Sequence, residues 1–433
     1  MRVLVVGSGG REHALCWKLA QSPELGDLFC APGNPGIESV ADLVPIAADE
    51  IQKLADFAAD LKIDLTVVGP ELPLTLGIAD EFANRGLALF GPSREAARLE
   101  GSKVFAKRFM KEHGIPTAEF EVVLDADQAS KAAKRFGFPV VLKADGLAAG
   151  KGVVIPRNDE ELSEAFDVFF SERRFGDAGA RLVVEEFLEG EEVSLMAVVD
   201  GQRFLPLATS KDYKRIGDDD QGPNTGGMGA HSPAGVLARG DAKKILDDVM
   251  QPVVAGMAAH GNPFRGFLYA GIILTPDGLR VLEFNVRLGD PEAQPLMMRM
   301  DEDLLPVLAS GATGRFEKQR LDFQKAAAAC IVLAAQGYPG SPVLGEPIEG
   351  IATASSREGV EVFHGGTRLE EGRLTTAGGR VLNVCATAPD LRGALQQAYQ
   401  AAEEIRWSGK TFRSDIGRRV LMAIEGAAGE ASR

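Results

Sequence analysis

The sequence has few cysteines, four in 433 residues, and no two of them have the Cys-x-x-Cys spacing of a metal-binding pair. The isolated positions of Cys16, Cys30, Cys330 and Cys385 argue against a zinc knuckle and against a disulfide framework. We therefore expect four small buried thiols in a reducing compartment.

Positive charge is also scarce, because 47 Lys and Arg stand against 62 Asp and Glu, a formal net charge of −15. A chain of this charge repels a polyphosphate, so nucleic acid is not expected as a partner. The longest apolar run, residues 326–335, is too short to span a bilayer and indicates a buried strand. Residues 1–7 show neither a basic leader nor a long apolar segment. We expect a cytoplasmic protein that acts on small molecules without a membrane partner, as a monomer or weak dimer.

The length suggests about three domains, and 45% hydrophobic with 25% charged residues is typical of globular proteins. In the first hundred residues, strand patterns alternate with helices that begin near Arg11, Glu50 and Leu74. The predicted strands are residues 3–6, 28–31, 65–68 and 87–90. This alternation favours a doubly wound parallel sheet. A helix over 102–113 then ends at Gly114 and Pro116, which predicts a domain boundary.

The middle of the chain predicts a compact unit at about residues 121–193, followed by further strands and helices. Its predicted elements are helices 127–136 and 159–170 and strands 140–143, 153–155 and 182–185. Residues 210–233 are polar and rich in Gly and Pro, and we expect a long functional loop there. A strand at 194–199, a helix at 241–260 and strands at 269–274 and 279–284 complete this region. From about residue 325 we expect short strands and a helix at 391–405.

Residues 281–292 combine strand-like alternation with side chains that bind metals and phosphates. One predicted face carries Glu283, Asn285 and Arg287. The opposite face carries Leu282, Phe284 and Val286. Carboxylate and carboxamide oxygens suit Mg²⁺, and a guanidinium suits phosphoryl oxygens. The alternative is an ordinary half-buried strand with a solvated face.

Two glycine turns follow predicted strands of the first sheet. Residues 7–12 lead into a helix, yet Glu12 stands where a dinucleotide site needs a small residue, so we exclude NAD. Arg11 and the amides of Gly9 and Gly10 suit a single small phosphate, or the turn needs glycine for its backbone alone. For residues 69–71, a structural turn and a ligand-binding turn are equally compatible with the sequence.

Residues 143–152 resemble a Walker A loop but lack its spacing and its Ser or Thr. The glycines predict a mobile flap over phosphates, with Lys143 and Lys151 supplying charge. The alternative is a hairpin with two solvated lysines. Residues 183–192 leave a buried strand and are acidic, which fits a nucleoside site or a solvated turn.

The predicted loop at 210–233 carries a basic cluster that includes Lys211, Lys214 and Arg215. In a chain of net charge −15, this cluster predicts an anionic substrate, and Gly226 and Gly227 could form a backbone nest for an anion. The five histidines show no ligand spacing, and no serine or cysteine nucleophile motif occurs. We expect chemistry that runs through a metal, lysines, arginines and carboxylates.

Taken together, these motifs resemble the phosphoribosylamine glycine ligase family of ATP-grasp enzymes over essentially the whole chain. The matching segments are residues 9–15, 31–34, 143–152, 222–229, 283–292, 365–369 and 378–384. The resemblance implies an α/β ATP-grasp fold with an N-terminal doubly wound domain at 1–101. It further implies an ATP-grasp body at 102–324 with a mobile lid at about 121–193, and a small α+β domain at 325–433.

The resemblance also implies a reaction, in which ATP energy joins glycine to 5-phosphoribosylamine through a glycyl phosphate during purine synthesis. The expected catalytic residues are Arg287 and Lys143. The expected ligands of Mg²⁺ or Mn²⁺ are Glu283 and Asn285. Expected ATP contacts are Lys103, Lys143, Lys151, Glu185, Glu186, Phe187, Leu188 and Glu192. Expected substrate contacts are Gly9, Gly10, Arg11, Asp212, Lys214, Asn224, Gly226, Gly227, Arg287 and Asp290, with Asp212 and Asp290 on the glycine amine.

The sequence departs from the family pattern in four places. Residues 269–274 lack the further metal carboxylate of other ATP-grasp enzymes, and Lys211, His231 and Leu288 replace the expected Gln, Tyr and Phe. Two rival hypotheses are an ATP-grasp carboxylase and a nucleotide-binding regulator without turnover.

Overall fold

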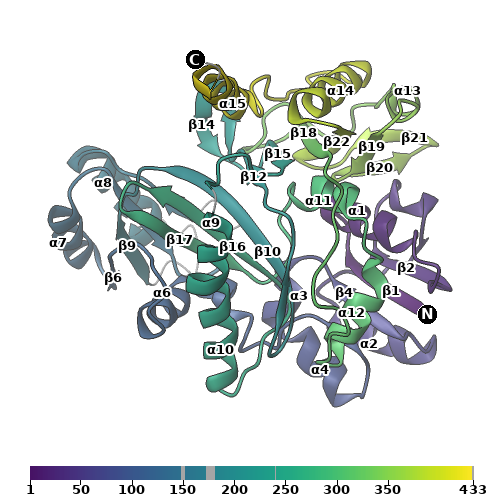
Figure 1. Cartoon of the computed structure of the whole chain (residues 1–433), viewed down its shortest axis with the longest axis horizontal. Coiled ribbons are helices and arrows are strands. Elements are labelled where there is room, and N and C mark those ends of the chain that lie inside the picture. The colour runs from purple at the N-terminus through teal and green to yellow at the C-terminus, as the bar shows by residue number, and fades with distance from the viewer. Residues whose placement is uncertain (148–151, 172–180, 239, 432–433) are drawn as a thin grey trace.

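The computed structural model describes residues 1–147, 152–171, 181–238 and 240–431 (Figure 1). The first sheet is parallel, with the strand order β3-β2-β1-β4-β5. Its strands are β1 (Arg2–Gly7), β2 (Asp27–Pro32), β3 (Asp42–Leu43), β4 (Leu65–Val68) and β5 (Leu89–Phe90). Its helices are α1 (Gly10–Leu19), η1 (Ile37–Ser39), α2 (Ile51–Asp60), α3 (Glu71–Leu76), α4 (Ile78–Asn84) and α5 (Arg98–Gly101).

Strand β1 explains why this sheet is doubly wound. Val3 and Val5 belong to one hydrophobic core, whereas Leu4 and Val6 belong to the core on the opposite face. A strand buried on both faces is a continuous apolar run, and the predicted doubly wound sheet is confirmed. The single helix expected from Leu74 is instead two helices, because Gly77 adopts φ +93° between them.

The central sheet is antiparallel, with the order β11-β10-β16-β17. Its strands are β10 (Glu191–Asp200), β11 (Phe204–Pro206), β16 (Arg265–Thr275) and β17 (Gly278–Asn285). Around it lie α6 (Lys103–Glu112), α9 (Asp241–Ile245), η5 (Leu246–Met250), α10 (Gln251–Ala259), α11 (Ala293–Arg299) and α12 (Leu304–Ala312). Met196 and Val198 share a core with Val3 and Val5, so the first two sheets pack around common apolar side chains.

A separate small unit has its own hydrophobic core and lies at the far left of Figure 1. Its antiparallel sheet has the order β6-β9-β7-β8. The elements are β6 (Phe120–Val123), α7 (Ala126–Phe136), β7 (Val140–Ala144), β8 (Val153–Val154), α8 (Asp159–Phe166), η2 (Asp167–Ser171) and β9 (Leu182–Glu186). Asp125 caps α7 by accepting from the Gln128 amide, and Ala129, Ala132 and Ala133 bury one helical face.

The last sheet, of order β12-β15-β18-β22-β19, joins two distant parts of the chain. Its strands are β12 (Lys211–Asp212), β15 (Gly229–Ser232), β18 (Ala327–Ala334), β19 (Val360–His364) and β22 (Arg380–Ala388). Two hairpins are attached, β13 (Arg215–Gly217) with β14 (Gln221–Asn224) and β20 (Thr367–Glu370) with β21 (Arg373–Thr376). The helices are η4 (Asp218–Asp220), α13 (Ile351–Ser355), α14 (Leu391–Glu404) and α15 (Arg418–Ala431).

The expectation of one long loop at 210–233 is therefore wrong, since short strands occupy much of it. In Figure 1 these teal strands lie beside the yellow-green C-terminal strands. Gly229 permits the close approach, because a Cβ there would lie 2.8 Å from the Cys330 carbonyl oxygen. Among the described residues, no helix is long and apolar enough to cross a membrane.

Candidate active site

A bulge in β17 sets the direction of the polar side chains predicted to form the site. Gly271 pairs with Glu283 but Ile272 pairs with Val281, so Leu282 is the extra residue. The strict alternation expected from the sequence is wrong at this point: Val281 and Phe284 are fully buried, whereas Leu282 is only half-buried. The Leu282 carbonyl accepts a hydrogen bond of 3.1 Å from Lys143 Nζ.

Lysines surround the carboxylates beside this bulge. Lys103 Nζ lies 3.0 Å from Glu283 Oε2, and Lys143 Nζ lies 2.9 Å from Glu185 Oε2. Lys107 Nζ lies 3.0 Å from the same Glu185 oxygen. Three ammonium groups thus face two carboxylates within one cavity, which gives this part of an acidic protein a local positive excess.

The pKa values of this cluster follow from its burial and its charges. Lys103 holds the pKa of Glu283 far below its usual range, although burial opposes this. Burial lowers the pKa of Lys107 to about 8, against the opposing effect of Glu185. Lys107 was not predicted from the sequence, although its position four residues after Lys103 on α6 places both on one helical face.

The turn after β9 presents the residues expected to hold a nucleoside. The Glu186 amide donates to the Glu119 carbonyl and its carboxylate accepts from the Glu119 amide, so this residue is held at both ends. Phe187 is 39% exposed and Leu188 is half-buried. Glu185 Oε1 is buried without a hydrogen-bond partner among the described residues. Lys151 lies outside the described residues.

Arg287 follows β17 and is the centre of a second charged group. Its Nη2 donates to Asn285 Oδ1 at 3.2 Å and lies 2.9 Å from Glu100 Oε1. Its Nε donates to Glu71 at 3.4 Å. Burial works against the charge, but Glu100 and Glu71 raise the pKa of Arg287 above its ordinary value. The turn at 69–71, left open by the sequence, thus places Glu71 against Arg287.

Glu100 was not predicted from sequence. Its Oε2 accepts from the Val286 amide at 2.8 Å, which fixes the backbone immediately before Arg287. Nothing in the pattern around residue 100 indicates this role, because the contact joins residues 186 positions apart.

Arg11, in the first glycine turn, lies close to the segment that contains Arg287. Arg11 Nη1 donates to the Leu288 carbonyl at 3.0 Å, and its Nε donates to Glu12 at 2.6 Å. Glu12 also accepts from the Gly9 amide at 2.6 Å. The Gly9 amide therefore already has an acceptor within the protein. The buried guanidinium of Arg11 places a positive charge near the end of β17.

Asp212, Lys214 and Glu192 form a third group. Lys214 Nζ lies 3.1 Å from Glu192 Oε2 and 3.9 Å from Asp212 Oδ2. Burial raises the pKa of Asp212 to about 7, with Lys214 opposing this and neighbouring carboxylates adding to it. Glu192 lies on β10, Asp212 on β12 and Lys214 just after β12. The structure thus brings Glu192, expected to contact ATP, beside Asp212 and Lys214, expected to contact the substrates.

The glycine segment at 226–227 differs from the expected anion nest. The Gly226 amide donates to Tyr338 Oη and the Gly227 amide donates to Thr225 Oγ1, each at 2.9 Å. Because both N–H groups already have protein acceptors, these two amides form no nest. Their carbonyls face Arg380 instead, whose Nη1 donates to Gly226 at 2.6 Å and to Gly227 at 3.4 Å. Asn224 ends β14 and pairs with Arg215.

Arg380 itself was missed, although it lies within the matching segment 378–384. Its Nη2 donates to Asp290 Oδ2 and its Nη1 to the Asp290 carbonyl, both at 2.6 Å. Asp290 also accepts from Gln294 at 2.7 Å. A C-terminal strand thereby holds the turn that follows Arg287.

Comparison with known proteins decides the family. Residues 1–100 match the phosphoribosylglycinamide synthetase N domain, residues 101–293 its ATP-grasp (A) domain, and residues 328–419 its C domain. The chain belongs to the phosphoribosylglycinamide synthetase family.

Named relatives of this family agree with the match. The chain is 48% identical over 429 residues to a phosphoribosylamine–glycine ligase of Pseudomonas aeruginosa, covering 98% of this chain and all of the relative. It is 47% identical to that of Vibrio vulnificus, covering 97% and 99%. The crystal structure of the Thermotoga maritima phosphoribosylamine–glycine ligase is 36% identical, with a TM-score of 0.83 and coverage of 96% and 100%.

More distant structures share the fold alone. A Campylobacter jejuni biotin carboxylase, 16% identical, has a TM-score of 0.74 and covers 95% of this chain and 92% of that one. The family and the ATP-grasp fold class predicted from the motifs are thus confirmed.

The residues at positions 211, 231 and 288, which depart from the family pattern, have structural partners. Lys211 forms an ion pair with Glu191. His231 is fully buried, with Nε2 3.2 Å from Tyr213 Oη, and burial lowers its pKa to about 4. Leu288 is buried and offers its carbonyl to both Arg11 and Arg287.

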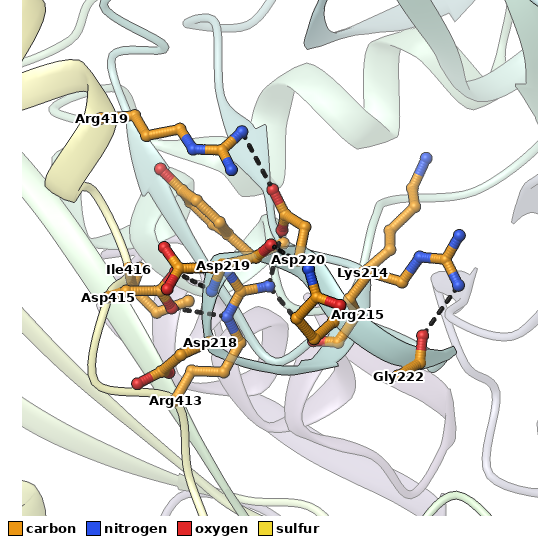
Figure 2. A network of polar contacts seen from close by, with 12 residues as sticks. Lys214, Arg215, Asp218, Asp219, Asp220, Gly222, Arg413, Asp415, Ile416 and Arg419 are labelled. Atoms are coloured by element: carbon orange, nitrogen blue, oxygen red, sulfur yellow. Dashed lines mark hydrogen bonds and ion pairs between the residues drawn. The ribbon is translucent and has the colours of Figure 1, made fainter.

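Arg413, a buried arginine near the C-terminus, contacts the segment that follows Lys214 (Figure 2). Arg413 donates to both oxygens of Asp415, at 2.7 and 2.8 Å, and to Asp220 at 2.9 Å. Its guanidinium lies 5.3 Å from the ring centre of Tyr213. Burial favours the neutral form of Asp415, but Arg413 lowers the pKa of that carboxyl to about 2. We call this network the Arg413 clasp.

Proposed function

We propose that this chain uses ATP to join glycine to 5-phosphoribosylamine, giving glycinamide ribonucleotide, ADP and phosphate. Its similarity to phosphoribosylamine–glycine ligases supports this proposal. The observation that carries the proposal is the meeting of Arg287 with Asn285 and Glu100, beside the Lys103–Glu283 pair, in a chain that matches all three family domains. The proposed division is 1–101, 102–324 with a mobile lid at about 121–193, and 325–433.

The ATP site in this proposal extends from the lysine cluster to the turn after β9. Lys103, Lys143 and Lys151 neutralise the phosphates, and the backbone of Glu186 and Leu188 reads adenine. Phe187 covers the base and Glu192 takes a ribose hydroxyl. The unpartnered buried Glu185 Oε1 supports this assignment, because it is an acceptor that a purine amino group can satisfy.

Glu283 and Asn285 would hold Mg²⁺ or Mn²⁺, and their oxygens fit the preference of Mg²⁺ for a few protein ligands together with phosphate oxygens. When bound, such an ion would supply positive charge that offsets the negative charge of the phosphate oxygens during transfer. The low pKa of Glu283 keeps that carboxylate ionised at every physiological pH. Lys103 then shares its charge between Glu283 and the nucleotide.

Phosphoryl transfer in the proposed reaction needs no protein nucleophile. The glycine carboxylate oxygen attacks the γ-phosphorus, the bond to ADP breaks, and a glycyl phosphate forms. The amine of phosphoribosylamine then attacks the acyl carbon, and phosphate leaves while the nitrogen loses a proton. Arg287 and Lys143 stabilise the charge on the transferring group, and closure of the lid excludes water from the acyl phosphate.

The acceptor site in this proposal combines residues of the first glycine turn, of the segment 210–233 and of the turn after Arg287. Asp212 and Asp290 hold the glycine amine, whereas Arg11 and Lys214 attract the sugar phosphate. Gly9, Gly10, Asn224, Gly226 and Gly227 shape the backbone around these substrates. Small molecules are thus the proposed partners, in the cytoplasm, for a monomer or weak dimer.

A coupled assay with ATP, glycine and freshly prepared phosphoribosylamine tests the function. Release of ADP and phosphate that depends on both other substrates is expected. ADP release with bicarbonate in place of glycine would support an ATP-grasp carboxylase instead, and ATP binding without any turnover would support a regulator.

A further inference from the structure

We propose that Glu112, His113 and His260 form a second metal site, for a transition-metal ion of the Zn²⁺ type, that is separate from the ATP-linked cation. The two histidines are 147 residues apart in the sequence, so no spacing motif identifies them as ligands of one ion. In the structure, one ligand atom from each of the three side chains lies within 4.8 Å of the others. Among the described residues, this is the one such group of His, Cys, Asp and Glu side chains.

Two of the three separations match the edges of a metal tetrahedron. The Nε2 atoms of His113 and His260 are 3.3 Å apart, and His260 Nε2 lies 3.2 Å from Glu112 Oε1. Two ligands at about 2.0–2.1 Å from a tetrahedral Zn²⁺ are about 3.3 Å apart. Two imidazoles and one carboxylate also form the ligand set of catalytic zinc sites, with a fourth position left open.

Hydrogen bonds alone cannot satisfy all the close contacts among these three side chains. A neutral imidazole nitrogen carries either one proton or one lone pair, so His260 Nε2 cannot accept from His113 while donating to Glu112. With a proton it splits a single N–H between two acceptors, and without one it accepts from His113 and leaves Glu112 without that donor. A cation among the three atoms uses one lone pair from each of them.

The ligands are held in place before any ion binds. His113 and His260 are the C-terminal caps of α6 and α10, and each amide closes the last turn of its helix. The ring of Phe109 lies 4.4 Å from that of His113 and 5.6 Å from that of His260. Gly256 allows this packing, since a Cβ there would lie 2.9 Å from the His113 ring.

The two helix ends and the access from solvent also suit a cation. Two helix C-termini meet at the cluster, and the aligned peptide dipoles give each of these ends a partial negative charge. The side chains of Glu112 and His260 are 60% and 32% exposed, so an ion can enter from solvent. An adjoining cavity of about 140 Å³, lined by Arg98, Arg108 and Arg181, leaves room for water or a small anion as fourth ligand. Such an ion would join α10 to α6, the helix whose first residue, Lys103, contacts Glu283.

Titration of the full chain with Co²⁺ in excess Mg²⁺ tests this proposal, because four-coordinate Co²⁺ absorbs visible light far more strongly than the hydrated ion. We expect one Co²⁺ per chain with strong absorption, displaced by one equivalent of Zn²⁺. His260→Asn and Glu112→Gln should each weaken binding at least tenfold. Glu164→Gln, at an exposed carboxylate of α8, is the matched control and should bind as the parent does.

Ligase turnover in Mg²⁺ shows that the variants are folded, since neither His260 nor Glu112 belongs to the proposed catalytic groups. Absence of Co²⁺ absorption in the parent chain at millimolar Co²⁺ would overturn the second metal site. So would equal affinity in the parent and His260→Asn. Either result leaves the ligase proposal untouched.

Discussion

The Arg380 guanidinium in strand β22 lies 2.6 Å from the Asp290 carboxylate, and it also donates to the Gly226 and Gly227 carbonyls. One C-terminal side chain therefore holds two turns of the proposed acceptor site. These turns come from residues 90 and about 154 positions away in sequence. Removal of Arg380 should affect the acceptor substrates before it affects ATP.

We predict that Arg380→Ala raises the KM for phosphoribosylamine about tenfold or more, because a charged hydrogen bond of this kind contributes about 1.5–3 kcal/mol. The KM for ATP should change much less. Arg368→Ala, in the neighbouring β20 and with an exposed side chain, is the control. Steady-state kinetics with each substrate varied in turn checks this, and an equal rise in the KM for ATP would contradict it.

Arg287→Ala should lower turnover by more than tenfold, since Arg287 is proposed to stabilise the transferring phosphoryl group. A smaller fall, worth less than about 1.4 kcal/mol, would remove Arg287 from the mechanism. The substitution also leaves Glu100 buried without its guanidinium, so thermal unfolding should be measured in parallel. Arg287→Lys, which keeps the charge but not the fork, should recover only part of the rate.

Glu283→Gln should raise the Mg²⁺ concentration needed for half-maximal activity by at least about tenfold, because a neutral amide is a poorer ligand than a carboxylate. The measurement is turnover against free Mg²⁺ at saturating ATP. Unchanged activity together with unchanged Mg²⁺ dependence would be enough to abandon the metal assignment at this residue.

Asp212 gives a pH dependence whose sign follows from its raised pKa of about 7. Only the ionised carboxylate can pair with an ammonium group, so the KM for glycine should fall as pH rises from 6 to 8. The linked effect on stability is opposite, because a raised carboxyl pKa makes the native state less stable as pH rises from 3.8 towards 7. Asp212→Asn should flatten both profiles, and persistence of the KM profile in this variant would assign the titration elsewhere.

The Arg413 clasp should contribute strongly to stability. Arg413→Ala leaves Asp415 buried without its bidentate partner, which typically costs about 3–5 kcal/mol. Arg418→Ala removes a half-exposed arginine from the same network and should cost less than about 1 kcal/mol. Urea unfolding of both variants provides the comparison. Similar midpoints for the two would show that the buried arginine has no special role.

Local pattern was enough for much of the fold. Three elements appear close to their predicted bounds: the strand at 3–6, the helix at 102–113 and the strand at 326–335. Each of them is specified by the order of apolar and polar residues within its own segment. The ends of α3 and α4 and the division at Gly77 were not predicted, since one residue's φ interrupts an otherwise helical pattern.

The strands within the polar stretch at 210–233 could not be predicted from local sequence pattern. Its strands exist because the backbone of β15 pairs with β18, about one hundred residues further along the chain. Composition gives no signal for that pairing, as Gly and Pro are poor strand formers. The same holds for the bulge at Leu282, which arises from register with β16 and not from the alternation of residues 281–287.

The sequence by itself determined which chemical groups occur together in short segments: oxygen ligands beside an arginine, and lysines near glycines. These features depend on residue type and short spacing, which the chain carries locally. Only the tertiary structure decided which groups meet, as Arg380 with Asp290, Glu100 with Arg287, Arg413 with Asp415, and His113 with His260. All but the Arg413–Asp415 contact join distant segments, and packing of the sheets around shared cores brings those segments together.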